Sequence, residues 1–334
     1  MTKETEAEKL FEKARNCLDN YQLDEAIELG NELLSMNFSG GFEVLALAYQ
    51  QQNDFDRAIE ILETGVEQCP DLWLLWQLLG NMYSYRKNYA EAYSAYDRAL
   101  ACPDVWSDSV MLNKAIALSR EGDYEGSEAA LPALENSNLA IEILSVRLAN
   151  LNALEEWYKV MQYEPVVGSY VQEVFRQGDG NEINASDLGF VSSILADLAY
   201  AYLQHGDAVE RAKESARLSL NLNRQCARAL QVVREIRNEK SEDAVAFRVI
   251  VEGRWPEKME DDDRELGFFS TYEVVASNTE EALEYIKEIE SKDLVATLSL
   301  DEAEELAPEP SLTKGVYWRS GYNLFPLEET DDLE

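Results

Sequence analysis

A helical pattern recurs along much of the sequence with a period of about 34 residues, and it is clearest at residues 73–103, WLLWQLLGNMYSYRKNYAEAYSAYDRALACP. Gly80 and Ala92 are small residues at the two positions where antiparallel helices would cross closely. The volume between one helix pair and the next would be filled by large aromatic residues, Trp76, Tyr83, Tyr89 and Tyr96. Pro103 then ends the second helix, because proline lacks the amide hydrogen that a helix needs. The spacing predicts stacked helix pairs, since each pair can bury its apolar face only against its neighbours.

The same frame fits other segments of the chain. Ala26, Ala58 and Ala92 are the small anchoring residues of three successive copies, and they are 32 and 34 residues apart. A fourth copy is degenerate, because Ser127 replaces the usual alanine and Pro132 should distort the second helix. The predicted solenoid, residues 1–238, consists of copies at about 7–38, 39–72, 73–105 and 108–136, a divergent helical segment at 137–190, a fifth copy at 191–223 and a capping helix at 224–238.

The copy at 73–103 closely resembles one tetratricopeptide repeat. The signature positions of that repeat hold Trp76, Leu79, Gly80, Tyr83, Tyr89, Ala92, Tyr96 and Ala99. The resemblance covers about residues 7–237 and implies a right-handed α-α superhelix whose concave groove, lined by the first helix of each pair, binds peptides or helices. We therefore expect a mostly α fold, in which a tetratricopeptide-type superhelix is followed by a small α/β (α+β) domain.

The repeat frame also predicts which side chains face the groove. The partner-binding candidates there are Arg15, Gln50, Gln77, Asn81 and Tyr200. Members of the family that grip the C-terminal carboxylates of chaperone tails need several Lys, Arg and Asn in the groove, and here only Arg15 and Asn81 qualify. Binding of chaperone tails is therefore not expected. A competing interpretation is that the chain's own C-terminal domain fills the groove.

Near residue 240 the apolar period changes from that of a helix to that of a strand. AFRVIVEGRW and GFFSTYEVVAS are the first two predicted strands, and LVATLSL is the third. The segment TEEALEYIKEIES is predicted to be a helix capped by Asn278 or Thr279, because a side-chain oxygen there can accept from the free amides of the first turn. Residues 244–329 are thus expected to form a small, acidic α+β domain.

The closing stretch KGVYWRSGYNLFP, residues 314–326, is predicted to be a hairpin that turns at Ser320 and Gly321. On that pairing one face carries Val316, Trp318 and Phe325, and the other carries Tyr317, Arg319, Tyr322 and Leu324. The first face is predicted to be core. The second has the composition enriched at interfaces, so it is expected to meet either the solenoid or a partner.

The chain is strongly acidic, with 65 acidic and 29 basic side chains and a formal net charge of −36. Residues 241–334 hold 26 acidic and 8 basic side chains, so the C-terminal domain is more acidic for its length than the rest. This charge argues against nucleic acid and against anionic membranes as partners, and it favours a basic protein. The candidates for that contact are Glu260, Asp261, Asp262 and Asp263 of an acidic loop, together with Tyr317, Arg319 and Tyr322 of the hairpin.

The residue types that most chemistry requires are scarce. His205 is the only histidine, and there is no phosphate-binding glycine motif and no zinc spacing. We therefore expect no enzyme activity, no metal and no cofactor. The four cysteines form no disulfide framework, the N-terminus lacks a signal peptide, and no stretch of about 18 apolar residues occurs, so a cytoplasmic location is expected.

These observations predict a non-catalytic protein that binds another, basic protein through the groove and the acidic domain. The C-terminal segment weakly resembles bacterial toxin-immunity domains, which implies one form of that function, the neutralisation of a basic toxin. An alternative is an assembly adaptor or chaperone that holds a linear peptide in the groove. A further alternative is an enzyme whose site consists of carboxylates and a metal ion.

Overall fold

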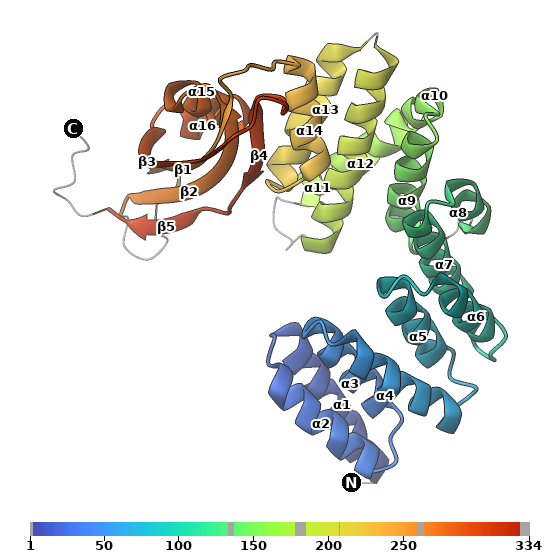
Figure 1. The fold of residues 1–334 in the computed structure, drawn as a ribbon. Helices are drawn as coiled ribbons and strands as arrows, with labels where there is room; N and C mark the ends of the chain where they lie inside the picture. The colour runs from blue at the N-terminus through green and yellow to red at the C-terminus, as the bar shows by residue number, and fades with distance from the viewer. Residues whose placement is uncertain (1–2, 133–136, 178–184, 207, 259–263, 328–334) are drawn as a thin grey trace. The chain divides into compact units, whose positions relative to one another are not determined.

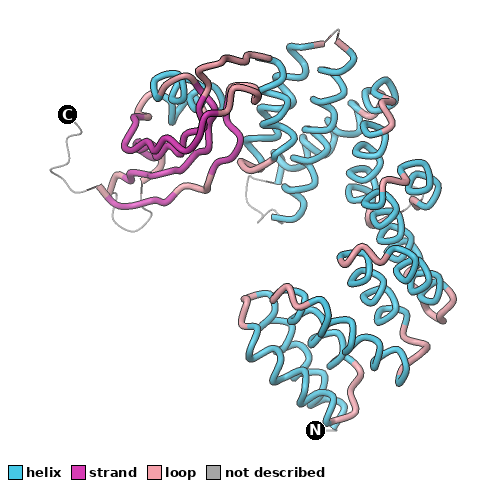
Figure 2. Tube along the Cα trace, in the orientation of Figure 1, coloured by secondary structure: helices cyan, strands magenta, loops and turns pink. Residues whose placement is uncertain are grey.

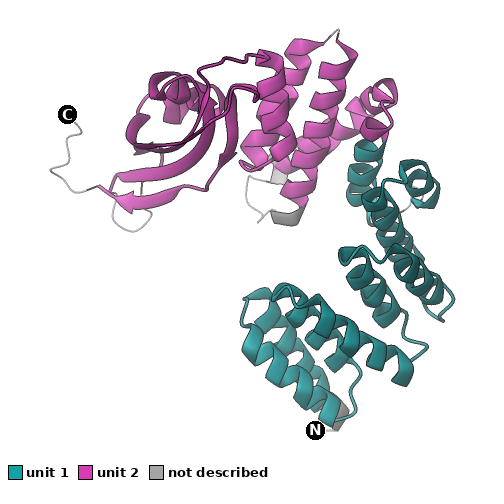
Figure 3. Cartoon of the chain, viewed as in Figure 1, with its two compact units in different colours: residues 1–150 teal, residues 151–334 magenta. Residues whose placement is uncertain are grey.

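The computed structural model describes residues 3–132, 137–177, 185–206, 208–258 and 264–327. The chain divides into two compact units, unit 1 at residues 1–150 and unit 2 at residues 151–334 (Figure 3). Most of the described chain is helical, and an antiparallel sheet follows near the C-terminus (Figures 1 and 2). The predicted fold class is confirmed.

Unit 1 is a series of antiparallel helix pairs. Its helices are α1 (Lys3–Asp19), α2 (Leu23–Ser35), α3 (Gly40–Gln51), α4 (Phe55–Gln68), α5 (Trp73–Tyr85), α6 (Tyr89–Leu100), α7 (Ser107–Glu121), α8 (Tyr124–Ala130) and most of α9 (Ala140–Ala153). Each odd-numbered helix from α1 to α7 packs against the even-numbered helix that follows it.

The first helix of each pair ends in the same way. One residue of each turn is in the left-handed region, namely Tyr21 (φ 57°), Asn53 (φ 60°), Lys87 (φ 62°) and Gly122 (φ 98°). The next amide then reaches back to a carbonyl five residues earlier, as Asn88 N does to Tyr83 O at 2.8 Å. This is the bond of a Schellman motif, which satisfies a free carbonyl at the helix end and reverses the chain. Three of these positions are not glycine, although glycine adopts this conformation most easily.

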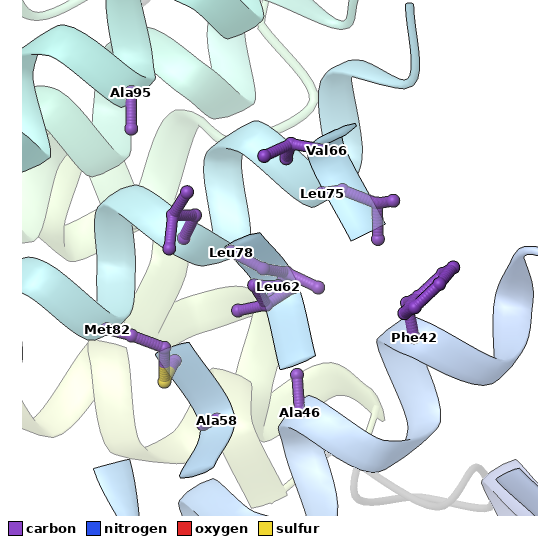
Figure 4. Close-up of a cluster of buried hydrophobic side chains, with 10 residues drawn as sticks. Phe42, Ala46, Ala58, Leu62, Val66, Leu75, Leu78, Met82 and Ala95 are labelled. Atoms are coloured by element: carbon purple, nitrogen blue, oxygen red, sulfur yellow. The ribbon is translucent and has the colours of Figure 1, made fainter. Parts of the chain in front are cut away.

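Apolar side chains pack between successive pairs. One buried cluster joins α3, α4, α5 and α6 through Phe42, Ala46, Ala58, Leu62, Val66, Leu75, Leu78, Leu79, Met82 and Ala95 (Figure 4). Gly80 permits the close approach of α6, because a Cβ atom there would lie 2.6 Å from the ring of Tyr96. Ala92, the small residue predicted at the other side of the crossing, is completely buried.

The fourth pair departs from this pattern as its sequence predicted. Its second helix, α8, has only seven residues and ends before Leu131 and Pro132. Ser127 is completely buried, and its hydroxyl donates to the carbonyl of Ala115 at 2.7 Å and accepts from Asn150 Nδ2 at 2.8 Å. The serine that interrupts the alanine pattern therefore joins three helices, α7, α8 and α9.

Unit 2 contains further helices and the sheet. The helices are α10 (Trp157–Met161), α11 (Glu164–Gln177), α12 (Ala185–His205), α13 (Val209–Leu222), α14 (Ala227–Arg237), α15 (Thr279–Ile289) and α16 (Lys292–Val295). The strands are β1 (Val245–Trp255), β2 (Leu266–Ala276), β3 (Ser299–Pro308), β4 (Gly315–Arg319) and β5 (Asn323–Pro326). The strand order is β3-β1-β2-β4, with β5 also paired to β2.

The first two strands and the following helix agree with the sequence. β1 and β2 pair antiparallel along their full length, and α15 packs on them with Ala282 and Ile286 buried. The side chain of Asn278 caps α15 by accepting from the amide of Glu281 at 2.9 Å. The third predicted strand, 294–300, is wrong over most of its length. The short helix α16 occupies its start because Leu294 is buried against β1, and β3 begins only at Ser299.

The predicted hairpin is wrong. β4 and β5 do not pair with each other; both pair with β2, and β5 continues along β2 beyond β4. Ser320 keeps the connecting segment on β2, because its amide donates to Thr271 O at 2.8 Å and its hydroxyl accepts from Thr271 N at 2.9 Å. The two strands are therefore one interrupted edge of the sheet.

Val316 is buried as predicted, but the predicted faces are wrong at Trp318 and Arg319. The pairing with β2 shifts between Val316 and Trp318, so Tyr317 is an extra residue in β4. A bulge of this kind reverses the alternation of side chains beyond it. As a result Trp318 is 42% exposed, whereas Arg319, predicted on the outer face, is 1% exposed.

Candidate interaction surfaces

The first helices of the pairs in unit 1 form one continuous layer. α3 contacts both α1 and α5, and α5 also contacts α7. The side chains that this layer presents on its free side are the natural candidates for partner contacts, as in other solenoids. The sequence placed Arg15, Gln50, Gln77 and Asn81 there.

Arg15 and Gln50 keep accessible side chains. Arg15 on α1 is exposed, and its guanidinium carbon lies 6.0 Å from the ring centre of Phe11. Glu43 on α3 is half-buried; burial raises the pKa of its carboxyl, and the charge of Arg15 opposes part of that rise. Gln50, near the C-terminal end of α3, is also half-buried. This part of the layer combines an aromatic ring, a cation and a carboxyl group.

Gln77 and Asn81 make contacts within the helical stack. Gln77 is only 7% exposed, and its Oε1 accepts from the hydroxyl of Ser109 at 3.2 Å. Asn81 Oδ1 accepts from the hydroxyl of the buried Tyr96 at 2.8 Å. Replacing either amide would therefore disturb the packing of the pairs, so neither residue offers a clean test of partner binding.

Tyr200 lies on α12 in unit 2, beside a buried acid. The guanidinium carbon of Arg228 is 4.5 Å from the centre of the Tyr200 ring, and Arg228 Nε is 3.6 Å from Asp197 Oδ1. Asn152 Nδ2 donates to the same carboxylate oxygen at 3.2 Å. Burial raises the pKa of Asp197 to about 6, although Arg228 and Asn152 act in the opposite direction. No local sequence pattern marks this group, because its members come from three separate helices, α9, α12 and α14.

The second set of predicted residues consists of an acidic loop and three residues near the C-terminus. Glu260, Asp261, Asp262 and Asp263 lie outside the described residues. Tyr317 packs under Arg234 of α14, with the guanidinium carbon 3.8 Å from the ring centre. Arg319 and Tyr322 also contact helical residues of the same unit. The face predicted to meet either the solenoid or a partner thus meets α13 and α14 in this structure.

Arg319 and Tyr322 belong to a buried network around Glu290. Arg319 Nη1 donates to Glu290 Oε1 at 2.5 Å, and Arg224 Nη1 donates to Oε2 at 2.9 Å. The hydroxyls of Tyr272 and Tyr322 donate to the same carboxylate at 2.9 Å and 2.5 Å. Burial alone would raise the pKa of Glu290, but the two arginines hold it below its usual range. We call these five residues the junction network.

Other charged contacts extend the junction between α13, α14 and the sheet region. Glu288 accepts from Arg237 and lies 3.6 Å from Lys213 Nζ, and Arg234 Nη1 donates to Val316 O at 2.6 Å. Residues 209–237 carry seven basic and three acidic side chains, so this stretch is locally positive in an acidic chain. The net charges of the two large parts of the chain conceal this basic stretch, which a charge count over single helices reveals.

The described residues contain no group of three or more His, Cys, Asp or Glu side chains placed to hold a metal ion. His205 is exposed at the end of α12, and the four cysteines are free thiols. No helix in the described ranges has both the length and the apolar character needed to span a membrane.

Comparisons with known proteins agree with this architecture. Residues 41–82, which run from α3 into α5, match the tetratricopeptide repeat family. A search of the curated proteins found no match to the sequence. Among solved structures, PilW, described as a widely conserved type IV pilus biogenesis factor, is similar with a TM-score of 0.50 and 21% identity, over 68% of this chain and 97% of PilW.

Two further structures are less similar. Naa15/Naa10 bound to HypK matches with a TM-score of 0.37 and 16% identity, over 69% of this chain and 34% of the other. The TPR2AB domain of yeast Sti1, in complex with an HSP90 peptide, matches with a TM-score of 0.32 and 16% identity, over 70% and 83% of the two chains. At these identities the likeness concerns the fold alone.

Proposed function

We propose that this tetratricopeptide-repeat protein is a non-catalytic scaffold that binds a segment of another protein on the layer formed by α1, α3, α5 and α7 of unit 1, here called the inner layer. The observation that carries the proposal is the contiguity of α1, α3, α5 and α7, because stacked helices of this kind offer an extended surface to a partner. The layer presents partly buried apolar side chains, Phe11, Leu47 and Ile116, beside Arg15 and Gln50. That mixture suits a peptide or helix with apolar anchors between polar residues.

We propose further that the partner is basic. A net charge of −36 favours encounter with a positively charged surface and repels acidic proteins. The location of the protein within the cell is proposed to be cytoplasmic, on the sequence alone.

Charge reversal on the inner layer tests the proposal. Proteins retained from native lysate by the wild-type chain would be identified by mass spectrometry, and the capture repeated with Arg15→Glu and with Gln50→Ala. We expect both variants to lose the specific protein, because each alters a side chain that would contact the bound segment directly. In a chain with a net charge of −36, the two-unit change in charge from Arg15→Glu alters the long-range attraction to a basic partner very little. Lys13→Glu is the matched control: this residue is on the same helix but pairs with Glu25 of α2 at 2.7 Å. Equal retention by Arg15→Glu, Gln50→Ala and Lys13→Glu would contradict binding on the inner layer.

A second candidate function is inhibition of a basic protein by an acidic surface. It is favoured by β3, an edge strand on which Asp301, Glu302, Glu304 and Glu305 are all exposed. The double variant Glu302→Lys, Glu305→Lys should then release the partner. Binding by the wild type should weaken strongly between about 50 and about 500 mM salt, because salt screens surface charges. Retention of the partner by this variant, together with its loss in Arg15→Glu, would leave only the inner layer as the binding surface. Neutralisation of a toxin, which the sequence resemblance suggested, is one form of this function.

A further inference from the structure

A pocket opens beside the junction network in unit 2. Its volume is about 280 Å³, and its walls come from the end of α13, the α13–α14 connection, the end of β1, the α15–α16 connection and the β4–β5 connection. Small-molecule sites usually measure about 300–1,000 Å³. The pocket is slightly smaller than that range and therefore suits a small ligand.

The charge of the pocket is opposite to that of the chain. Its charged lining residues are Arg224, Arg319 and Glu290, which is two cations against one carboxylate. The hydroxyl of Tyr322, also in the wall, stays neutral because burial and Glu290 raise its pKa. One positive charge is thus left without a balancing carboxylate among the lining residues. Placing an unbalanced charge out of water is costly, and an anion in the pocket would remove that cost.

The two arginines would attract an anion through their charge, because many of their hydrogen-bond donors already bind groups of the protein. Arg319 Nε donates to Arg224 O at 2.7 Å and its Nη2 donates to Leu220 O at 3.0 Å, so the side chain is held firmly in the wall. The side chain of Arg224 is 18% exposed and forms the accessible part of the pair. Neutral polar groups at the rim come from Asn221 and Ser291, which are both exposed.

Part of the pocket wall is apolar. Trp255, Pro256 and Leu294 line it. The ring of Trp255 is fixed by edge contacts to Tyr322, with ring centres 4.9 Å apart, and to Phe268 at 6.3 Å. A flat or branched apolar body could pack on this wall while an anionic group faces the arginines.

We propose that this pocket binds a small organic anion, a carboxylate or phosphate group attached to an apolar body. The anionic group lies against Arg224 and Arg319, and the apolar body packs against Trp255 and Leu294. This site is in unit 2 and is independent of partner binding on the inner layer of unit 1.

Calorimetry with the full chain tests the proposal. The probes are benzoate, phenyl phosphate and the uncharged benzyl alcohol, which share one ring and differ in the attached group. We expect saturable binding of benzoate or phenyl phosphate at one site, with affinity that falls as salt rises, and at least tenfold weaker binding of benzyl alcohol. The two anions separate a carboxylate site from a phosphate site. Equal binding of all three probes, or no saturable binding of either anion, would overturn the proposal.

Variants locate the site. Ser291→Asp adds a negative charge at the rim of the pocket. Repulsion between this charge and the anion should weaken binding about tenfold. Aspartate is also accepted at the N-cap position that Ser291 holds before α16, so folding should be retained. Ser39→Asp is the matched control, because Ser39 is the N-cap of α3 in unit 1 and, like Ser291, makes no side-chain cap hydrogen bond. Asn221→Asp repeats the test from α13. Anion affinity that is equal in the wild type, Ser291→Asp and Asn221→Asp would show that the anion binds elsewhere.

Discussion

In unit 1 the helix α5 packs on α6 through Gly80 and the ring of Tyr96, whereas in unit 2 the sheet region is joined to α13 and α14 through arginines and carboxylates. The first kind of contact is apolar and local, between helices that follow each other in the chain. The second kind joins residues far apart in sequence, such as Arg319 and Arg224, whose numbers differ by 95.

The two kinds of contact respond differently to change. The stability of an apolar contact depends on the volume of its side chains, so one extra methyl group can destabilise it. A buried charge network depends on every member, because the loss of one partner leaves another charge buried and unpaired. Loss of one member of the charge network in unit 2 should therefore cost more stability than one added methyl group in unit 1.

Glu290→Gln should cause the largest loss of stability. It removes the only carboxylate between Arg224 and Arg319 in the junction network, and breaking a buried ion pair typically costs about 3–5 kcal/mol. Urea unfolding combined with hydrogen exchange should show the loss in unit 2 and not in unit 1. The control is Glu284→Gln, whose 70% exposed side chain pairs with Lys287 on the surface of α15 and should change stability by less than about 0.5 kcal/mol. A similar small effect at Glu290 would mean that the network does not hold the junction.

The contribution of Asp197 to the stability of unit 2 should fall as the pH rises from about 4 to about 6. The pKa of Asp197 is raised from its ordinary value of 3.8 to about 6 in the folded chain, so the folded state binds more protons than the unfolded state between these values. At 1.36 kcal/mol for each pKa unit, the contribution that is full below pH 4 and lost above pH 6 is about 3 kcal/mol. The difference between the wild type and Asp197→Asn, measured by urea unfolding at several pH values, isolates it from other groups. A difference that does not change with pH would show that the Asp197 carboxyl is not held in its neutral form.

Gly80→Ala should destabilise unit 1 by about 1–3 kcal/mol, the usual cost of overpacking. Alanine favours helices more than glycine does, but the added Cβ would meet the Tyr96 ring at 2.6 Å. Gly168→Ala in α11 is the matched control, because a Cβ there meets nothing within 4 Å, and it should stabilise the chain by up to about 1 kcal/mol. Thermal unfolding of both variants checks the sign. Stabilisation by both changes would mean that α5 and α6 can move apart freely.

Ser127→Ala should destabilise unit 1 by about 1 kcal/mol, although it restores the alanine of the repeat pattern. The change removes the hydrogen bond to Ala115 O and one acceptor of Asn150 Nδ2, both of them buried. The reference is Ala92, which stands at the same position of the preceding pair: Ala92→Ser would place a hydroxyl in a buried crossing, where it needs a partner to avoid a desolvation cost. The midpoints of thermal unfolding of the two variants test this prediction. A higher midpoint for Ser127→Ala than for the wild type would show that the buried hydrogen bonds of Ser127 do not stabilise unit 1.

Sequence reasoning succeeded where the structure depends on neighbours in the chain. The helix pairs of unit 1, the short α8 before Pro132 and the Asn278 cap of α15 are all consequences of local spacing. The left-handed turns at Tyr21 and Lys87 were not anticipated, because the glycine that usually marks them is absent. Their spacing nevertheless follows that of the anchoring alanines Ala26, Ala58 and Ala92, which was visible in the sequence.

Prediction failed where a single extra residue or a distant partner decided the outcome. Tyr317 is the extra residue in β4, and it moved Trp318 out of the core and Arg319 into it. Pairing of β5 with β2, and not with β4, depends on Ser320 bonding to Thr271 across the sheet.

The sequence by itself determined that this chain stacks helix pairs and that an acidic α+β region follows them. Periodic burial acts within about one repeat length, so it can be read from spacing alone. Only the tertiary structure decided that Tyr317, Arg319 and Tyr322 meet α13 and α14, and that two arginines share one carboxylate beside a pocket. Such contacts depend on strand register and on residues far apart in the chain, and neither has a local signature.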